Sequence, residues 1–389
     1  MKPTIADVEL EVIDRYTQAA GERSADLCCP VEYDPEYLDV IPKEILERDY
    51  GCGDPSRYVH EGDRVLDLGS GSGKICYIAS QIVGSNGFVI GVDMNPEMLS
   101  LARKYRSEMA ERLGYANVEF RQGKIQDLSL DLERVEEHLG HSPVTDVDSL
   151  LEMQAFQEHL RKNAPMIPDQ SIDVVVSNCV LNLVRESDRL RLLAEIYRVL
   201  RNGGRIAISD IVSDEEVPPH MKQNGELWSG CISGAFTEHG FLRALEEAGF
   251  YGISLSKWDE KPWQTLEGIE FRSVTVTAFK GKEGPCVERN QAVMYKGPWK
   301  SVTDDDGHTL YRGERMAVCD KTFGIYTNHN GPYGGDIIGV HPLTEIEPEN
   351  AAPFNCHKSA RRSARESKGM EYQRSELSRG SSCGPDGCC

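Results

Sequence analysis

The sequence predicts an α/β fold built around a doubly wound parallel sheet. Short apolar runs alternate with helical segments from residue 64 to about 250, and a glycine-rich turn follows the first run. Strands that alternate with helices are typical of βαβ units and a parallel sheet. The length of 389 residues also predicts two to three domains, since a domain typically has about 150 residues.

The expected strands and helices follow one another in order along the chain. Strands are expected at 64–68, 87–93, 117–121, 171–177, 205–210 and 272–280. Helices are expected at 74–83, 95–113, 187–200 and 237–248. Pro96 stands near the start of the second helix, where proline is tolerated. Asn202-Gly203-Gly204 is typical of a helix C-terminus and ends the third.

The remaining segments define the expected domain organisation. Residues 1–62 form an N-terminal helical segment that carries several cysteines, and residues 63–280 form the core. An acidic insertion at 128–169 is expected to be partly helical. Residues 281–346 are expected to form a small β-containing domain, and 347–389 a polar, disordered tail that contains cysteines.

Composition restricts the partners and the compartment. The net charge of −20 argues against a nucleic-acid-binding protein, which normally carries a basic surface. No run approaches the ~18 apolar residues of a membrane span, and the N-terminus lacks the apolar region of a signal peptide. We therefore expect a cytoplasmic protein that binds neither nucleic acid nor a membrane. Its 12 cysteines would then be reduced, and so reactive, metal-binding or simply buried.

The glycine-rich turn has the features of a nucleotide site. Asp67 precedes Gly69-Ser-Gly-Ser-Gly73, and Asp93 ends the next strand 20 residues later. Such a turn lets backbone approach a ligand, and the acid can accept hydrogen bonds from ribose. The G-x-G-x-G spacing differs from the G-x-G-x-x-G of NAD-binding proteins, which remain the alternative. The pattern resembles class I S-adenosylmethionine-dependent methyltransferases, which implies a Rossmann-like core with the adenine flanked by Gly123-Lys-Ile125.

Two cysteines lie where a parallel sheet binds its ligands. Cys179 directly follows the fourth strand, and Cys231 lies in the long connection after the fifth. Ligands bind at the carboxyl ends of such strands, so both thiols are expected at the mouth of the cofactor cleft. Paired thiols beside a methyl donor favour a soft substrate. Trivalent arsenic fits, because it binds thiolates and keeps a lone pair that can attack an electrophilic methyl.

Four motifs make a more specific resemblance. Asp49-Tyr-Gly-Cys-Gly53, Leu66–Gly73, Ser177-Asn-Cys-Val-Leu-Asn-Leu183 and Trp228-x-x-Cys-x-x-Gly-Ala235 are similar to those of the arsenite S-adenosylmethionine methyltransferases. The resemblance implies that Cys179 and Cys231 hold As(III), with Cys52 as a third thiol. It also implies that an N-terminal cysteine pairs with Cys52, and both Cys28 and Cys29 are candidates. The cofactor contacts it implies are Tyr50, Asp67, Gly69, Ser70, Gly71, Gly73, Asp93, Met94, Gly123, Lys124, Ile125 and Asn178.

The expected function is that of a monomeric enzyme that methylates arsenite, and then methylated arsenite, in arsenic detoxification. As(III)-thiol adducts would be the substrate, and thioredoxin or glutathione would reduce the catalytic disulfide. One alternative is a methyltransferase for another small molecule, such as a quinone or sterol. The other is a metalloid-binding protein without catalysis. Four further cysteines are expected to have no catalytic role: Cys76, Cys286, Cys319 and Cys356. The terminal cysteines could trap metalloid or have no function: Cys383, Cys388 and Cys389.

Overall fold

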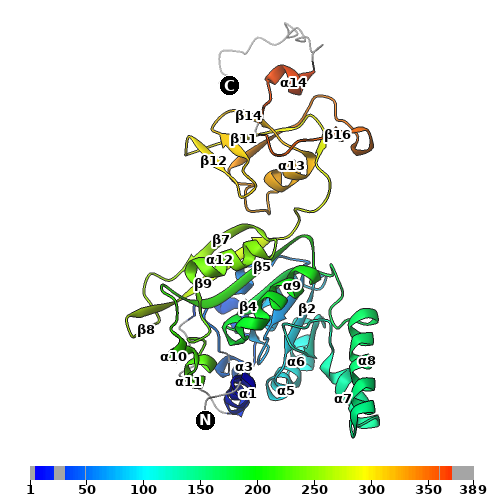
Figure 1. Cartoon of the computed structure of the whole chain (residues 1–389), viewed down its shortest axis with the longest axis vertical. Helices are drawn as coiled ribbons and strands as arrows, with labels where there is room; N and C mark the ends of the chain where they lie inside the picture. Colours follow the sequence, from blue (N-terminus) through cyan, green and yellow to red (C-terminus); the bar gives the residue numbers. More distant parts are fainter. Residues whose placement is uncertain (1–4, 22–30, 49, 359, 370–389) are drawn as a thin grey trace. The chain divides into compact units, whose positions relative to one another are not determined.

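The computed structural model describes residues 5–21, 31–48, 50–358 and 360–369 (Figure 1). The chain divides into two compact units, 1–281 and 282–389, and each is described by itself. Within the described ranges, no helix combines the length and the apolar character that a bilayer crossing requires.

The first unit is built on a nine-stranded sheet in the described part of the chain. Its strands are β1 (Arg64–Leu68), β2 (Phe88–Asp93), β3 (Val118–Gln122), β4 (Ile172–Asn178), β5 (Leu200–Ser213), β6 (Phe236–Thr237), β7 (Tyr251–Trp258), β8 (Gln264–Leu266) and β9 (Ile269–Phe279). The order is β3-β2-β1-β4-β5-β9-β7, with β6 beside β5 and β8 beside β9. Strands β1 to β5 are parallel as predicted, whereas β9 runs antiparallel to both β5 and β7.

Helices cover both faces of this sheet, as Figure 1 shows. The α-helices of the unit are α1 (Ile5–Gly21), α2 (Pro35–Leu38), α3 (Lys43–Glu47), α4 (Lys74–Val83), α5 (Pro96–Lys104), α6 (Arg106–Leu113), α7 (Leu132–His141), α8 (Val147–Asn163), α9 (Arg189–Val199), α10 (Pro219–Lys222), α11 (Gly225–Ser229) and α12 (Glu238–Glu247). The 3₁₀ turns in the described part of the unit are η2 (Pro55–Tyr58), η3 (Leu181–Leu183) and η4 (Glu186–Asp188).

The alternation of side chains along the strands explains the two layers. Val65 and Val89 point into a core shared with α3, α4, α5 and α6. Leu66 and Ile90, their chain neighbours, point into the opposite core, which α9 and α12 complete. Because the strands are buried on both faces, their sequences are apolar throughout. This arrangement leaves the carboxyl ends of β1 to β5 as the edge where a ligand can bind.

Several predicted elements differ in their limits. Helices α7 and α8 confirm that the acidic insertion is partly helical, and their contact surface includes His138 stacked on Phe156 at 4.0 Å. The predicted helix over 95–113 divides at Tyr105 into α5 and α6. Strand β5 already begins at Leu200, so Asn202-Gly203-Gly204 lies within it. Strand β7 was not predicted, and its exposed half mixes the apolar Leu255 and Trp258 with polar residues.

The second unit is a small β-containing domain. Its strands are β10 (Val287–Glu288), β11 (Ala292–Tyr295), β12 (Ser301–Thr303), β13 (Thr309–Tyr311), β14 (Arg315–Ala317), β15 (Ile337–Val340), β16 (Ala352–Pro353) and β17 (Ala360–Arg361). Helix α13 (Asp320–Thr327), η5 (Pro348–Asn350) and α14 (Ala364–Lys368) accompany them. Strands β16 and β17 pair with β10 and β14. The ordered unit therefore extends past residue 346, where the sequence places the start of a disordered tail.

Candidate active site

The turn between β1 and α4 forms a cradle at the carboxyl end of the sheet. Gly69 and Gly73 have φ angles of 68° and 87°, a region that favours glycine. A Cβ atom at Gly69 would overlap Val180, and one at Gly73 would meet the Phe120 ring at 2.8 Å. Within the described residues, the buried Ser70 hydroxyl has no hydrogen-bond partner. A buried hydroxyl without a protein partner can bond a ligand or an ordered water.

Asp93 closes the other side of this turn. One carboxylate oxygen accepts from the Gly71 N–H at 2.8 Å, and the other accepts from the Asn95 N–H at 2.8 Å. Burial raises the pKa of the Asp93 carboxyl, although these bonds oppose the shift. The side chain therefore fixes the glycine turn and the start of α5 while it faces the pocket.

A pocket of about 1070 Å³, counted to its open mouth, occupies this edge of the sheet. Ten of the twelve predicted cofactor residues line it: Tyr50, Asp67, Gly69, Ser70, Gly71, Asp93, Met94, Gly123, Ile125 and Asn178. The other two are not among the lining residues. Gly73 is the N-cap of α4, and the Lys124 ammonium pairs with Glu9 at 3.2 Å.

Helix α1 forms a wall of the pocket that sequence reasoning missed. Its lining residues are Glu9, Val12, Ile13 and Tyr16. The Asn95 amide donates to the Thr17 hydroxyl at 2.9 Å, and the Tyr50 hydroxyl donates to the Ala19 carbonyl at 2.9 Å. The helix is thus attached both to the segment that precedes β1 and to the turn that follows β2.

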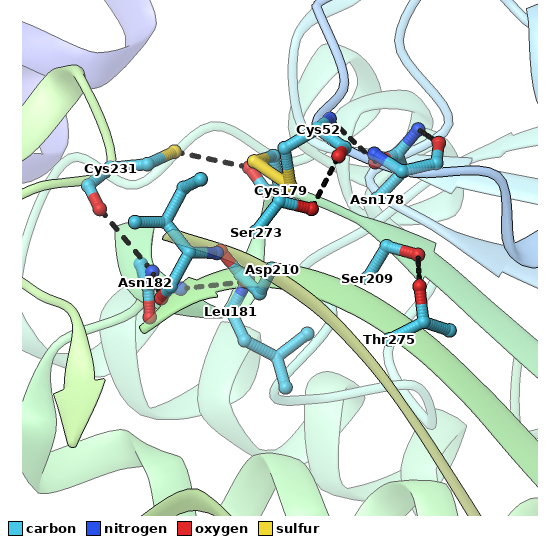
Figure 2. The surroundings of a disulfide bond; sticks show 12 residues. Cys52, Asn178, Cys179, Leu181, Asn182, Ser209, Asp210, Cys231, Ser273 and Thr275 are labelled. Atoms are coloured by element: carbon cyan, nitrogen blue, oxygen red, sulfur yellow. Dashed lines mark hydrogen bonds between the residues drawn. A yellow bond between two sulfur atoms is a disulfide. The ribbon is translucent and has the colours of Figure 1, made fainter. Parts of the chain in front are cut away.

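Three predicted thiols gather beside the pocket. Cys52 and Cys179 form a disulfide, although 127 residues separate them, and their Cα atoms lie 5.8 Å apart. Figure 2 shows the Cys231 thiol pointing toward this pair, and it donates to the Cys179 carbonyl at 3.2 Å. All three are buried in an apolar cluster that includes Ile211 and Phe271. Cys179 also lines the pocket, so it joins the thiol site to the cofactor pocket.

Two of these three cysteines have a strained backbone conformation. Cys179 and Cys231 have φ angles of 60° and 62°, which are uncommon for residues with a Cβ atom. This conformation costs about 1–2 kcal/mol for each residue. Strain of this kind concentrates at functional sites, where surrounding structure holds it in place. The backbone geometry therefore indicates function independently of the cysteine side chains.

Asn178 holds the Cys52 loop against the end of β4. Its Oδ1 accepts from the Cys52 N–H at 2.9 Å and from the Gly53 N–H at 3.0 Å. Its Nδ2 donates to the Gly53 carbonyl at 2.8 Å and to the Tyr33 hydroxyl at 3.2 Å. A Cβ atom at Gly51 would overlap this amide, so glycine is required there.

A buried acid and a buried amide lie beneath the thiols. Asp210 accepts from the backbone N–H groups of Leu181 at 2.9 Å and Ile211 at 2.8 Å. Burial raises the pKa of Asp210 to about 7, and these bonds limit the rise. Asn182 donates to the Ile211 carbonyl at 2.6 Å and to the Cys231 carbonyl at 3.3 Å. Sequence reasoning did not identify this buried pair. The feature that could have indicated it is the position of Asp210 at the end of the fifth predicted strand.

Helix α1 also reaches the thiol site. The Tyr16 hydroxyl hydrogen-bonds the Cys231 thiol. Burial and the nearby Cys231 raise the pKa of Tyr16 well above its ordinary value, so the hydroxyl keeps its proton at neutral pH. The Arg15 guanidinium donates to the Glu226 carbonyl and to the Ser229 hydroxyl, each at 2.9 Å. These contacts join α1 to the loop that carries Cys231.

The other predicted residues fall outside this group. Cys28 and Cys29 lie outside the described residues, so their pairing with Cys52 stays a prediction. Cys76 is buried in α4, where its thiol donates to Asp67 at 3.2 Å. The Trp228 indole donates to the Leu183 carbonyl at 3.1 Å, which anchors the Cys231 loop.

The sheet order, the glycine-rich turn after β1 and the acid at the end of β2 define the class: an S-adenosylmethionine-dependent methyltransferase of class I. The unpartnered Ser70 hydroxyl and the glycine cradle fit this cosubstrate. A family model described as a methyltransferase domain matches residues 59–249. A second model, a domain of unknown function (DUF8838), matches residues 282–372.

Known proteins identify the particular family. An arsenite methyltransferase from Aquipseudomonas alcaligenes is 32% identical over 334 residues, which are 80% of this chain and 86% of that protein. The human arsenite methyltransferase is 30% identical over 365 residues, covering 88% of this chain and 86% of its own. A crystal structure of an arsenic(III) S-adenosylmethionine methyltransferase from Chlamydomonas reinhardtii has a TM-score of 0.55 and 27% identity; the match covers 84% of this chain and 100% of that one. This chain belongs to the arsenite methyltransferase family.

Proposed function

We propose that this enzyme transfers methyl groups from S-adenosylmethionine to trivalent arsenic held by Cys179 and Cys231. The observation that carries the proposal is the position of Cys179, which lines the cofactor pocket and contacts both other thiol residues. A carbon- or oxygen-directed methyltransferase has no use for three thiols in one apolar cluster.

Reduction of the Cys52–Cys179 disulfide by a small thiol, which is itself oxidised to a disulfide, comes first. Capture of arsenic by the reduced thiols is then a ligand exchange. Arsenic arrives as an adduct with a small thiol such as glutathione. As each protein thiolate forms a bond to arsenic, one bond to the small thiol breaks, and the released thiolate takes up the proton. Cys52, whose loop Asn178 holds in place, is the third thiol for arsenite. The apolar cluster excludes water, which would otherwise hydrolyse the arsenic–sulfur bonds.

Methyl transfer depends on the orientation of arsenic relative to the methyl group. When bound, the cosubstrate supplies an electrophilic methyl group on a sulfonium sulfur. Arsenic held by the two strained cysteines directs its lone pair toward the pocket and attacks that methyl. The carbon–sulfur bond breaks, and its electron pair stays on sulfur. No general base is needed, so catalysis depends mainly on positioning. Helix α1, which touches both the pocket and Cys231, restricts the approach of the two reactants.

A redox step completes the reaction. Because arsenic uses its lone pair to form the new bond, it formally loses two electrons. Two protein thiols return them when they form a disulfide and release two protons. We propose Cys52 with Cys28 or Cys29 as this pair, and the Cys52–Cys179 disulfide supports the reactivity of Cys52. Thioredoxin or glutathione then reduces the disulfide, which is compatible with a transient catalytic bond.

Labelled S-adenosylmethionine incubated with arsenite, thiol and enzyme tests the proposal, with arsenic species separated afterwards. Cys179→Ser and Cys231→Ser should each abolish methylation of arsenite and of methylarsonous acid. Cys76→Ser is the matched control, because serine can still donate to Asp67. Full activity in either site variant, or an unlabelled arsenic fraction with the wild type, would refute the proposal.

A second variant tests the role of Cys52 separately. Cys52→Ser should lose arsenite methylation and keep methylation of methylarsonous acid in excess glutathione, since that substrate has fewer positions for thiols and glutathione can return the two electrons in place of Cys52. Equal losses on both substrates would contradict this role.

A further inference from the structure

Three cysteines of the second unit form a cluster that the methyl-transfer site does not use. The sulfur atoms of Cys286, Cys319 and Cys356 all lie within 4.8 Å of one another. They come from positions 33 and 37 residues apart in the sequence. Their unit is the one that matches a domain of unknown function.

The fold brings these thiols together through two separate contacts. Strand β10 pairs antiparallel with β16, and the Phe354 N–H donates to the Cys286 carbonyl at 2.9 Å. That ladder places the segment after β16, which carries Cys356, beside Cys286. The Arg289 guanidinium then pairs with Asp320 at 2.8 Å, which attaches the end of β10 to the first turn of α13. Cys319 is the N-cap of that helix.

The cluster has one deeply buried thiol and two more accessible ones. Cys319 is fully buried, whereas Cys286 and Cys356 are half-buried. The Cys319 sulfur accepts from the Thr322 N–H at 3.4 Å and lies 3.2 Å from the Thr322 hydroxyl. The N-terminus of α13 also favours negative charge at this position.

We propose that Cys286, Cys319 and Cys356 form a second site for trivalent arsenic, bound by three thiolates in the unit outside the methyltransferase core. Sulfur atoms that share a centre at about 2.3 Å lie about 4 Å apart. Sulfurs already within 4.8 Å of one another therefore need only small side-chain rotations to bind one.

The number of ligands favours arsenic over zinc. A structural zinc site has four protein ligands in a tetrahedral arrangement. Among the described residues, no fourth histidine, cysteine, aspartate or glutamate atom joins this group. Trivalent arsenic uses three bonds and keeps a lone pair, so three thiolates satisfy it. Binding from a three-thiol adduct breaks one arsenic–sulfur bond for each that forms. Each cysteine proton passes to a released thiolate, and no electron changes hands. Binding from arsenite alone breaks one arsenic–oxygen bond for each arsenic–sulfur bond that forms, and each released hydroxide leaves as water with the cysteine proton.

Arsenite binding to the reduced, full-length chain tests this site without S-adenosylmethionine. The chain is equilibrated by dialysis against arsenite alone, and the bound arsenic and zinc are measured by mass spectrometry. Cys286→Ser, Cys319→Ser and Cys356→Ser should each lose about one arsenic per chain. Cys76→Ser, which removes a buried thiol outside both clusters, should bind as much as the wild type. Cys319→Ser keeps a good N-cap for α13, so the fold is retained.

The same loss should occur when the methyl-transfer site has been removed. In a Cys179→Ser/Cys231→Ser chain, the further change Cys319→Ser should still remove one arsenic. This arm makes failure of the second site distinguishable from failure of the proposed function. Unchanged arsenic content in the three single variants would overturn the inference. The experiment could also find about one zinc per chain that arsenite does not displace and that Cys286→Ser removes. That result would overturn the inference in favour of a zinc site.

Discussion

Replacing Asn178 by alanine should release the Cys52 loop from the end of β4. The side chain makes two bonds to the backbone N–H groups of Cys52 and Gly53 and one to the Gly53 carbonyl. Cys52 is 1% exposed, so its N–H finds no water while the loop stays in place. The loop would therefore leave its position more often in Asn178→Ala, and Cys52 would meet Cys179 less often.

The size of the effect follows from these bonds. A buried hydrogen bond contributes about 1 kcal/mol net, and a buried donor left without a partner costs about 1–3 kcal/mol. Three lost bonds thus weaken the docked loop by about 3 kcal/mol. Since 1.4 kcal/mol is a factor of ten, the ratio of docked to undocked loop should fall about 100-fold. The effective concentration of Cys52 at Cys179 should fall with the docked fraction of the loop, by at most the same factor.

A redox titration measures this directly. The full-length enzyme is equilibrated in glutathione buffers, free thiols are alkylated, and the Cys52–Cys179 disulfide is quantified by peptide mass spectrometry. Asn117→Ala is the matched control, because Asn117 is also buried and makes three bonds, to Ser80 and Gly84, away from the thiols. It should lower stability without moving the redox midpoint. A change below about threefold in Asn178→Ala would refute the reasoning.

Three further predictions concern strain, α1 and pH. Cys231→Gly should be about 1 kcal/mol more stable to denaturant than Cys231→Ala, because only glycine relieves the positive φ; equal stabilities would contradict this. Tyr16→Phe should weaken arsenite binding about fivefold in a fluorescence titration, the value of one hydrogen bond to Cys231, while Tyr16→Ala weakens it further. Burial opposes ionisation of Asp304, but bonds from His308 and Tyr326 hold its pKa at about 2. The resulting stability, about 1 kcal/mol after screening, is present above about pH 4 and should be lost as pH falls toward 2. Asp304→Asn should remove that acid dependence of unfolding.

Much of the core was accessible from sequence because the parallel strands are short and apolar. The turn after β1 and the acid after β2 were identifiable from glycine spacing, since few residues adopt the φ angles that this turn requires. The pocket wall formed by α1 could not be predicted from the sequence. Helical spacing of Val12 and Tyr16 predicts a helix but does not say which element its apolar side packs against.

The thiols illustrate the same limit. Family motifs identified Cys179 and Cys231, and topology placed Cys179 at the carboxyl edge of the sheet. The role of Asn178 in holding Cys52 depends on a contact between residues 126 positions apart, which spacing cannot predict. The cluster around Cys319 was missed for the same reason. Its members match no short metal-binding motif, and pairing of β10 with β16 is what joins them.

Both thiol groups are built on one principle, which connects arsenic binding to folding. Each draws cysteines from separate segments, and each has hydrogen bonds or pairing that hold those segments before any ligand arrives. Arsenic that binds such a group crosslinks loops that the unfolded chain keeps apart. A ligand at 100 times its dissociation constant stabilises the folded state by about 2.7 kcal/mol, provided that the unfolded chain does not bind it. Adjacent thiols such as Cys28 and Cys29 would reduce this gain by binding arsenic in the unfolded chain. The proposed ligands, by contrast, are separated by 33, 37 or 127 residues, so we expect them to bind arsenic together only once the fold has formed. Distance along the sequence should therefore make arsenic binding at these two proposed sites depend on the folded chain.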